Sequence, residues 1–83
     1  MADSGTPQRE YHTLDCVGLY CPTPVLKTKE EIDKIAIDEV LEVLADDPAA
    51  EEDIKAWAKR AGQKILEIAQ TDEGKRFLIQ RVK

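Results

Sequence analysis

The sequence predicts an α/β fold, a two-layer α+β sandwich in which a four-stranded mixed sheet carries two helices on one face. Runs of strand-forming residues and runs with apolar residues at helical spacing follow in the order βαβαββ, without an internal repeat. The 83 residues suffice for one domain and leave little room for an enclosed pocket beside a core. Because crossovers between parallel strands are right-handed, both helices should cover the same face of the sheet.

The N-terminal part of the chain predicts a tail and then a strand. Residues 1–9 are polar and aperiodic, which predicts a disordered tail before a single domain at 10–83. Residues 10–16 can form a short strand with Leu14 and Cys16 on one face. If Leu14 faces the core, Cys16 does too.

A first helix is predicted over residues 22–34, where Val25, Thr28 and Ile32 repeat at helical spacing. The following run, residues 40–45, is almost wholly apolar, which is typical of a strand inside a sheet.

The run Asp46-Asp47-Pro48 predicts the start of a second helix rather than a catalytic pair of carboxylates. Asp47 is a good N-cap and Pro48 suits the first helical position. Gly62 supplies the stop. Trp57 lies on the apolar stripe of this helix and is expected in the core.

The C-terminal part of the chain predicts a hairpin. Residues 64–70 and 76–82 are rich in strand-forming residues, and the loop at 71–75 between them contains Gly74.

The composition of the chain argues against several classes of protein. The formal charge of −5 and the dispersed basic residues disfavour nonspecific nucleic-acid binding, which needs many Lys or Arg side chains at phosphates. No apolar stretch approaches the roughly 20 residues that span a bilayer, and no secretory signal is apparent. Two cysteines and one histidine make a poor zinc site. We therefore expect a cytoplasmic protein, monomeric when free, with no metal, cofactor, membrane or direct nucleic-acid partner.

The motif Cys21-Pro22-Thr23-Pro24 opens the first predicted helix and is the one that carries chemistry. With Cys21 as N-cap, prolines are tolerated in the first turn, and the Thr23 amide is the expected capping donor to the sulfur. A helix N-terminus favours anions, which predicts a lowered pKa for the Cys21 thiol and a nucleophilic thiolate. Gly18 allows a sharp turn before the motif. From the residues alone, the alternative is that Cys21 is a small buried hydrophobe.

The second cysteine and the histidine have less specific interpretations. Cys16 is expected to be structural, since buried thiols are usually inert. A redox pair of Cys16 and Cys21 is the alternative, although the spacing is not C-x-x-C. His12 is expected to be exposed or capped, with a base near Cys21 as the alternative.

Three residues after the motif have two interpretations. Lys27 and Lys29 are expected on a solvated helix face, and Leu26 is expected to be partly buried. Alternatively, they form a docking surface in which the lysines are a positive rim around Cys21 and Leu26 is an exposed contact.

Residues 14–25, LDCVGLYCPTPV, closely resemble the signature of the TusA family, also called SirA-like, D-x-x-G-x-x-C-P-x-P. The resemblance continues through residues 45–49 and 53–54 and covers residues 11–82. It implies a small βαβαββ protein.

The match is close but departs from the family pattern in two places. Asp15 and Gly18 match the signature, and their implied roles are structural or orienting. Cys16 stands where many members have Ala, which leaves the redox role open. Asp38 occupies a turn where Gly is common, which puts the geometry of that loop in doubt.

The resemblance implies a sulfur carrier in which Cys21, supported by Pro22, Thr23 and Pro24, accepts sulfane sulfur as a persulfide and passes it on. The implied donor is a cysteine desulfurase or a rhodanese-like protein, and the implied acceptor is a DsrE- or TusD-like protein. The relay would end in 2-thiouridine of tRNA or in sulfur oxidation. Two other hypotheses stay open: a thiol-disulfide redox protein using Cys16 and Cys21, and a non-catalytic regulatory interaction domain.

Overall fold

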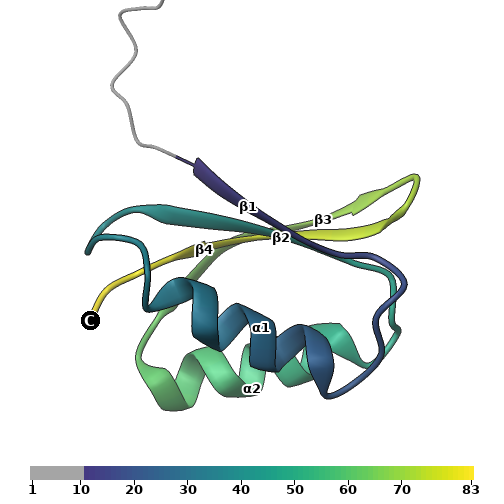
Figure 1. Ribbon diagram of the computed structural model, residues 1–83, viewed down its shortest axis with the longest axis horizontal. Helices are drawn as coiled ribbons and strands as arrows, with labels where there is room; N and C mark the ends of the chain where they lie inside the picture. Colours follow the sequence, from purple (N-terminus) through teal and green to yellow (C-terminus); the bar gives the residue numbers. More distant parts are fainter. Residues whose placement is uncertain (1–10) are drawn as a thin grey trace, which may run out of the picture.

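The computed structural model describes residues 11–83. Its elements follow in the predicted order βαβαββ: β1 (Tyr11–Cys16), α1 (Thr23–Ile32), β2 (Val40–Ala45), α2 (Ala50–Ala61), β3 (Lys64–Thr71) and β4 (Gly74–Gln80) (Figure 1). The predicted tail at residues 1–9, and Glu10 at the start of the first predicted strand, lie outside the described residues.

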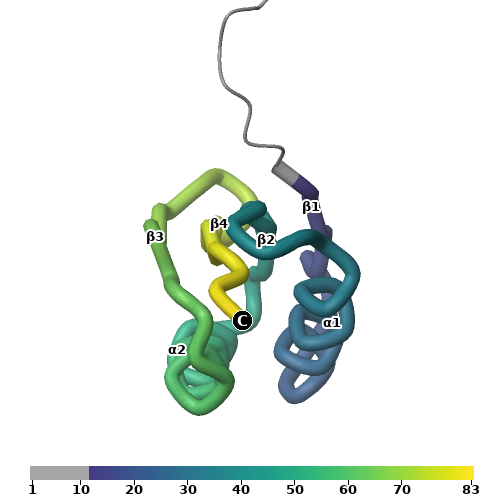
Figure 2. The backbone as a smooth tube through the Cα atoms, turned by 90° about the vertical axis from the view of Figure 1, so that its left-hand side faces the viewer, coloured from purple at the N-terminus to yellow at the C-terminus, as the bar shows by residue number. Residues whose placement is uncertain are grey.

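The four strands form one mixed sheet in the order β1-β2-β4-β3. β1 pairs with β2 in parallel, and β4 pairs antiparallel with both β2 and β3. Both helices lie side by side on one face of this sheet (Figures 1 and 2). The predicted two-layer sandwich is therefore confirmed.

The core lies between the sheet and the helices, where apolar side chains of the central strands meet those of α2. Val43 of β2, Phe77 of β4 and Ile54 of α2 have no exposed surface. Trp57 is buried among them, as expected. Burial of side chains of this size stabilises the fold by roughly 1.5–3 kcal/mol each. The core thus fixes the sheet against the helices whose first turns build the site.

The first helix starts later than predicted. α1 begins at Thr23 with Pro22 as its N-cap residue, and it ends at Ile32 rather than Lys34. The prediction that Cys21 is the N-cap is therefore wrong by one residue.

The second helix also starts later than predicted. α2 begins at Ala50, and its N-cap is Ala49 rather than Asp47. Asp47 instead closes a turn before the helix, because its Oδ1 accepts a hydrogen bond from the Ala49 amide at 3.0 Å. Gly62 ends the helix in the left-handed region with φ 75°, as its sequence position predicts.

One residue with positive φ lies in the connection before β2, and another is the first residue of β4. The hairpin turn is two residues, Asp72 and Glu73, rather than the five predicted, because Gly74 already belongs to β4. Gly74 has φ 138°, and a Cβ added there would lie 2.5 Å from the Ala45 carbonyl oxygen. Asp38 has φ 77°, so its turn is left-handed without Gly.

Candidate functional site

The loop after β1 and the loop after β2 meet at one end of the sheet, because the two strands are parallel and end together (Figure 1). Two hydrogen bonds join the loops. The Gly18 amide donates to Asp46 Oδ1 at 2.9 Å, and the Cys21 amide donates to Asp47 Oδ2 at 2.5 Å. The two carboxylates thus hold the backbone of the cysteine loop in place.

The cysteine loop also has bonds within itself. The Leu19 amide donates to the Cys16 carbonyl at 3.1 Å, and the Val17 amide donates to Asp15 Oδ1 at 3.0 Å. Gly18 has φ 87°, a left-handed conformation that side chains disfavour. Asp15 and Gly18 therefore shape the loop and do not contact the thiol.

Pro24 anchors the start of α1 in the core. Its side chain is fully buried, whereas Pro22 is exposed. The Thr28 hydroxyl, itself buried, donates to the Pro24 carbonyl at 2.7 Å. Cys21 thus sits directly before a helix end whose position is fixed by packing.

Cys21 is exposed, and its thiol faces a carboxylate from the other helix. Cys21 Sγ lies 2.7 Å from Asp53 Oδ2, in the first turn of α2, with the thiol as donor. The hydrogen bond to Asp53, partial desolvation and the negative charges of Asp53 and Asp47 raise the pKa of the Cys21 thiol.

The prediction of a lowered pKa for Cys21 is therefore wrong, and the predicted bond from the Thr23 amide to its sulfur is absent. The Thr23 amide instead donates to the Tyr20 carbonyl at 2.8 Å. Pro22 and Pro24 have no N–H to offer, so the helix end presents few amides to an anion. Two carboxylates next to the thiol outweigh what remains of the helix dipole.

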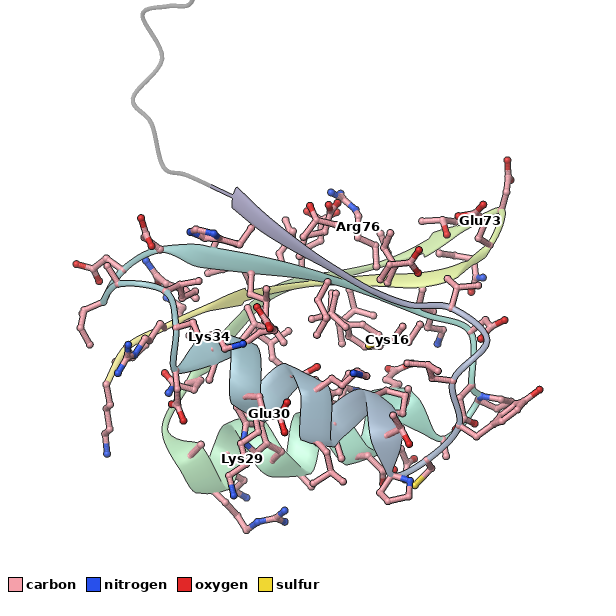
Figure 3. All side chains as sticks on the ribbon, in the orientation of Figure 1. Cys16, Lys29, Glu30, Lys34, Glu73 and Arg76 are labelled. Atoms are coloured by element: carbon pink, nitrogen blue, oxygen red, sulfur yellow. The ribbon has the colours of Figure 1, made fainter. Side chains whose placement is uncertain are left out.

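The surface near the loop exposes large hydrophobic side chains and two lysines of α1. Tyr20 is 72% exposed and Leu26 is 52% exposed, so Leu26 is not the partly buried residue expected by default. Lys29 lies on α1 with its side chain exposed (Figure 3). Lys27 is also exposed, and its positive charge lowers the pKa of the Cys16 thiol, which partly offsets the effect of burial. The three residues of the predicted docking surface, Leu26, Lys27 and Lys29, are thus all exposed on α1.

Cys16 lies between the sheet and the helices with no exposed surface (Figure 3). Burial is the main cause that raises the pKa of its thiol. Both Cys16 and Cys21 are free thiols, one in the core and one on the surface. His12 bonds Glu39 at 3.1 Å near the start of β1, whereas the site is built after the last residue of that strand.

Further observations on residues 11–83 concern metal ligands, cavities and membrane-spanning helices. No group of three or more His, Cys, Asp or Glu side chains is placed to hold a metal ion in this part of the chain. An open hollow lies beside the site but is not lined by Cys21; its lining residues are Ala45, Asp46, Asp47, Pro48, Gln70, Gly74 and Lys75. No helix within these residues is long and apolar enough to cross a membrane.

The contacts of Asp47 and Asp53 with Cys21 were missed by sequence reasoning. The sequence predicts Asp47 as the N-cap of the second helix and includes position 53 in the stretch that resembles the TusA family, but neither pattern predicts a contact with the thiol. Asp47 and Asp53 are 26 and 32 residues from Cys21 along the chain. The resemblance at residues 45–54 was the one sequence signal that pointed to this region.

Known proteins support the family suggested by the motif. The model of the family Sulfurtransferase TusA matches residues 12–81. A proposed sulfur carrier of Archaeoglobus fulgidus is 42% identical over 71 residues, which cover 84% of this chain and 92% of that protein. The sulfur carrier protein TusA of Allochromatium vinosum is 35% identical over 68 residues, which cover 82% of this chain and 90% of that protein.

A solved structure supports the fold. The SirA-like protein of Desulfitobacterium hafniense superposes with a TM-score of 0.71 over 86% of this chain and 95% of that one, at 24% identity. The family match spans nearly all of the described residues and includes the loop with Cys21. The chain therefore belongs to the TusA family of sulfur carriers.

Proposed function

We propose that this chain carries sulfane sulfur as a persulfide on Cys21, taking it from a donor protein and passing it to an acceptor protein. The observation that supports this most directly is the contrast between the two free thiols: Cys21 is exposed on a fixed loop, and Cys16 is buried. A carrier thiol must reach the sulfur of another protein, and only Cys21 can do so without unfolding.

The transfer is redox-neutral. In loading, Cys21 Sγ attacks the terminal sulfur of the donor persulfide, a new S–S bond forms at Cys21, and the donor S–S bond breaks. The donor leaves as a thiolate and takes up the proton that Cys21 has lost. In delivery an acceptor thiolate attacks the terminal sulfur, and Cys21 returns to a thiol. No dissociable cofactor takes part.

The surrounding residues have supporting roles in this proposal. Asp15, Gly18, Pro22, Thr23 and Pro24 hold the loop and the helix start that present the thiol. Leu26, Lys27 and Lys29 lie on the exposed part of α1 that follows the motif, and we propose that they contact the partner.

The proposed partners are those of a sulfur relay. The donor is a cysteine desulfurase or a rhodanese-like protein, and the acceptor is a DsrE- or TusD-like protein. The relay serves 2-thiouridine synthesis in tRNA or sulfur oxidation, in the cytoplasm, where thiols stay reduced.

Mass spectrometry tests the assignment. After incubation with a cysteine desulfurase and cysteine, or with a rhodanese and thiosulfate, the wild type should gain one sulfur atom. Cys21→Ser should gain none, and Cys16→Ala should load like the wild type. Equal loading of wild type and Cys21→Ser contradicts the proposal. If Cys16→Ala abolishes loading and an intramolecular disulfide forms reversibly, the redox alternative is correct.

A further inference from the structure

The carboxylate of Asp53 is the group in contact with the sulfur that would carry the cargo. Its Oδ2 accepts the hydrogen bond from Cys21 Sγ at 2.7 Å. The other charged group that faces the thiol is Asp47, which holds the Cys21 amide. The charged groups that act on Cys21 are both carboxylates, and carboxylates disfavour the thiolate form of a neighbouring cysteine.

Two acidic residues in the first turn of α2, Glu51 and Asp53, differ in whether a cationic side chain pairs with them. Glu51 pairs with both Lys55 and Lys75. Asp53, two residues later, has no ion pair with a Lys, Arg or His of the described chain, and neither has Asp47. The thiol site is thus a patch of uncompensated negative charge, next to the exposed apolar side chain of Tyr20.

We propose that Asp53 holds the proton on Cys21 in the free carrier, and that a cationic side chain of the sulfur donor pairs with Asp53 and releases the thiol for attack. This inference rests on the proposed function. It assigns a catalytic role to Asp53, and it specifies that the donor presents Lys or Arg beside its persulfide.

The charge balance supports such a partner. While Asp53 is unpaired, the hydrogen bond and the negative charge favour the protonated thiol, which is a poor nucleophile. A cation that pairs with Asp53 removes both effects, and the ionised Cys21 then attacks the terminal sulfur. The thiol proton ends on the released donor thiolate, so the step balances. The same cation also offsets the repulsion between the carboxylates and the new persulfide anion.

Small persulfides of opposite charge test the inference without the natural donor. Cysteamine persulfide carries an ammonium group, and glutathione persulfide has a net negative charge. We expect the wild type to load faster from the cationic donor, on the order of tenfold at low ionic strength. For Asp53→Asn, the ratio of the loading rate from the cationic donor to that from the anionic donor should fall. We expect it to lie within about threefold of the same ratio measured for a free thiol. Intrinsic donor reactivity cancels when the ratio is compared between variants.

Glu52→Gln is the matched control, because it removes one negative charge from the neighbouring residue, which is exposed and has no contact with Cys21. It should keep the wild-type ratio. Asp53→Glu, which retains a carboxylate, should keep a preference for the cationic donor. Circular dichroism of each variant checks that α2 is intact.

The outcomes separate this inference from the proposed function. If Asp53→Asn keeps the wild-type ratio, or if Glu52→Gln lowers it equally, Asp53 has no special role and the inference is wrong, although Cys21 remains the carrier. If neither donor loads the wild type more than Cys21→Ser, the proposed function itself is wrong.

The alkylation rate of Cys21 gives a second test of the role of Asp53. This rate should not change if Asp53 has a purely structural role. With iodoacetamide at pH 7, Asp53→Asn should react faster than the wild type, because loss of the carboxylate lowers the pKa of Cys21. When the pKa falls, the thiolate fraction rises by more than the nucleophilicity of the thiolate falls. The alkylation rate should therefore rise on the order of threefold for each pKa unit. Glu52→Gln should react at the wild-type rate. A slower reaction of Asp53→Asn would overturn the inference.

Discussion

The two cysteines lie five residues apart and occupy opposite environments. Cys16 ends β1 with no exposed surface, whereas Cys21 is exposed on the loop that follows. Both thiols have a raised pKa, but the main cause is burial at Cys16 and the hydrogen bond to Asp53 at Cys21. The cause at Cys16 persists for as long as the protein is folded.

The cause at Cys21 lies at the surface, where the proposed donor cation would pair with Asp53. The comparison teaches that a raised pKa alone does not separate an inert thiol from the thiol that we propose as the carrier. What separates them is exposure together with the nature of the group that holds the proton. A buried thiol needs unfolding to react, and an exposed thiol next to a carboxylate needs only a partner.

The largest expected difference between the two thiols is in alkylation of the native wild type. Cys16 reacts only when the end of the edge strand β1 opens away from the core, and such an opening costs a share of a typical stability of about 5–15 kcal/mol. We expect Cys21 to be labelled at least about 1,000-fold faster than Cys16, measured by peptide mass spectrometry over time. In guanidinium chloride the rates should converge. Comparable native rates would mean that the core does not protect Cys16.

Substitution by serine should affect stability at one cysteine and not at the other. Cys16→Ser places a hydroxyl group in the apolar core, which we expect to lower the free energy of unfolding by about 1–3 kcal/mol. Cys21→Ser, at an exposed site, should change it by less than about 0.5 kcal/mol. Urea denaturation curves provide both values. If the two variants lose equal stability, the assignment of Cys16 to the core is wrong.

A substitution in the segment between the two cysteines should lower the stability of the fold by less than Cys16→Ser does. Gly18 has φ 87°, and a Cβ added there would meet nothing within 4 Å. Gly18→Ala should therefore lose about 1–2 kcal/mol of stability from backbone strain alone. Val17→Ala is the matched variant, because it shortens an exposed side chain next to Gly18. We expect only a small change in the denaturation midpoint of this variant. An unchanged midpoint for Gly18→Ala would show that the loop relaxes without cost.

Local signals predicted most of the fold. The order βαβαββ, the buried face of β1 and the end of α2 at Gly62 follow from patterns within a few residues. The helix starts were less accurate, because an acidic or proline-rich turn can precede a helix without belonging to it. Asp47 illustrates this, since it lies three residues before the helix begins and its side chain accepts a hydrogen bond from the Ala49 amide.

The chemistry of the thiol could not be predicted from the sequence in the same way. The motif identified Cys21, but the pKa of its thiol depends on Asp53, which is 32 residues away and reaches it only because the first turns of α1 and α2 are adjacent. The effect of the helix end alone predicts that the pKa of Cys21 is lowered, whereas in the structure it is raised. A helix dipole is a weak effect, and one carboxylate within hydrogen-bonding distance reverses it.

The smallest expected effect concerns Glu51, the paired counterpart of Asp53 on α2. Its hydrogen bonds to Lys75 and Lys55 lower the pKa of Glu51 below the usual 4.5. A lowered folded-state pKa contributes stability that is present above about 4.5 and is lost as the pH falls through the folded-state value. Glu51→Gln should therefore have a slightly lower melting temperature than the wild type at pH 7. The difference should shrink as the pH falls through the folded-state pKa of Glu51, where that side chain loses its charge. Asp53→Asn should not show this pattern, because Asp53 has no ion pair with a cation within residues 11–83. A pH-independent difference for Glu51→Gln would show that its lysine pairs do not stabilise the fold.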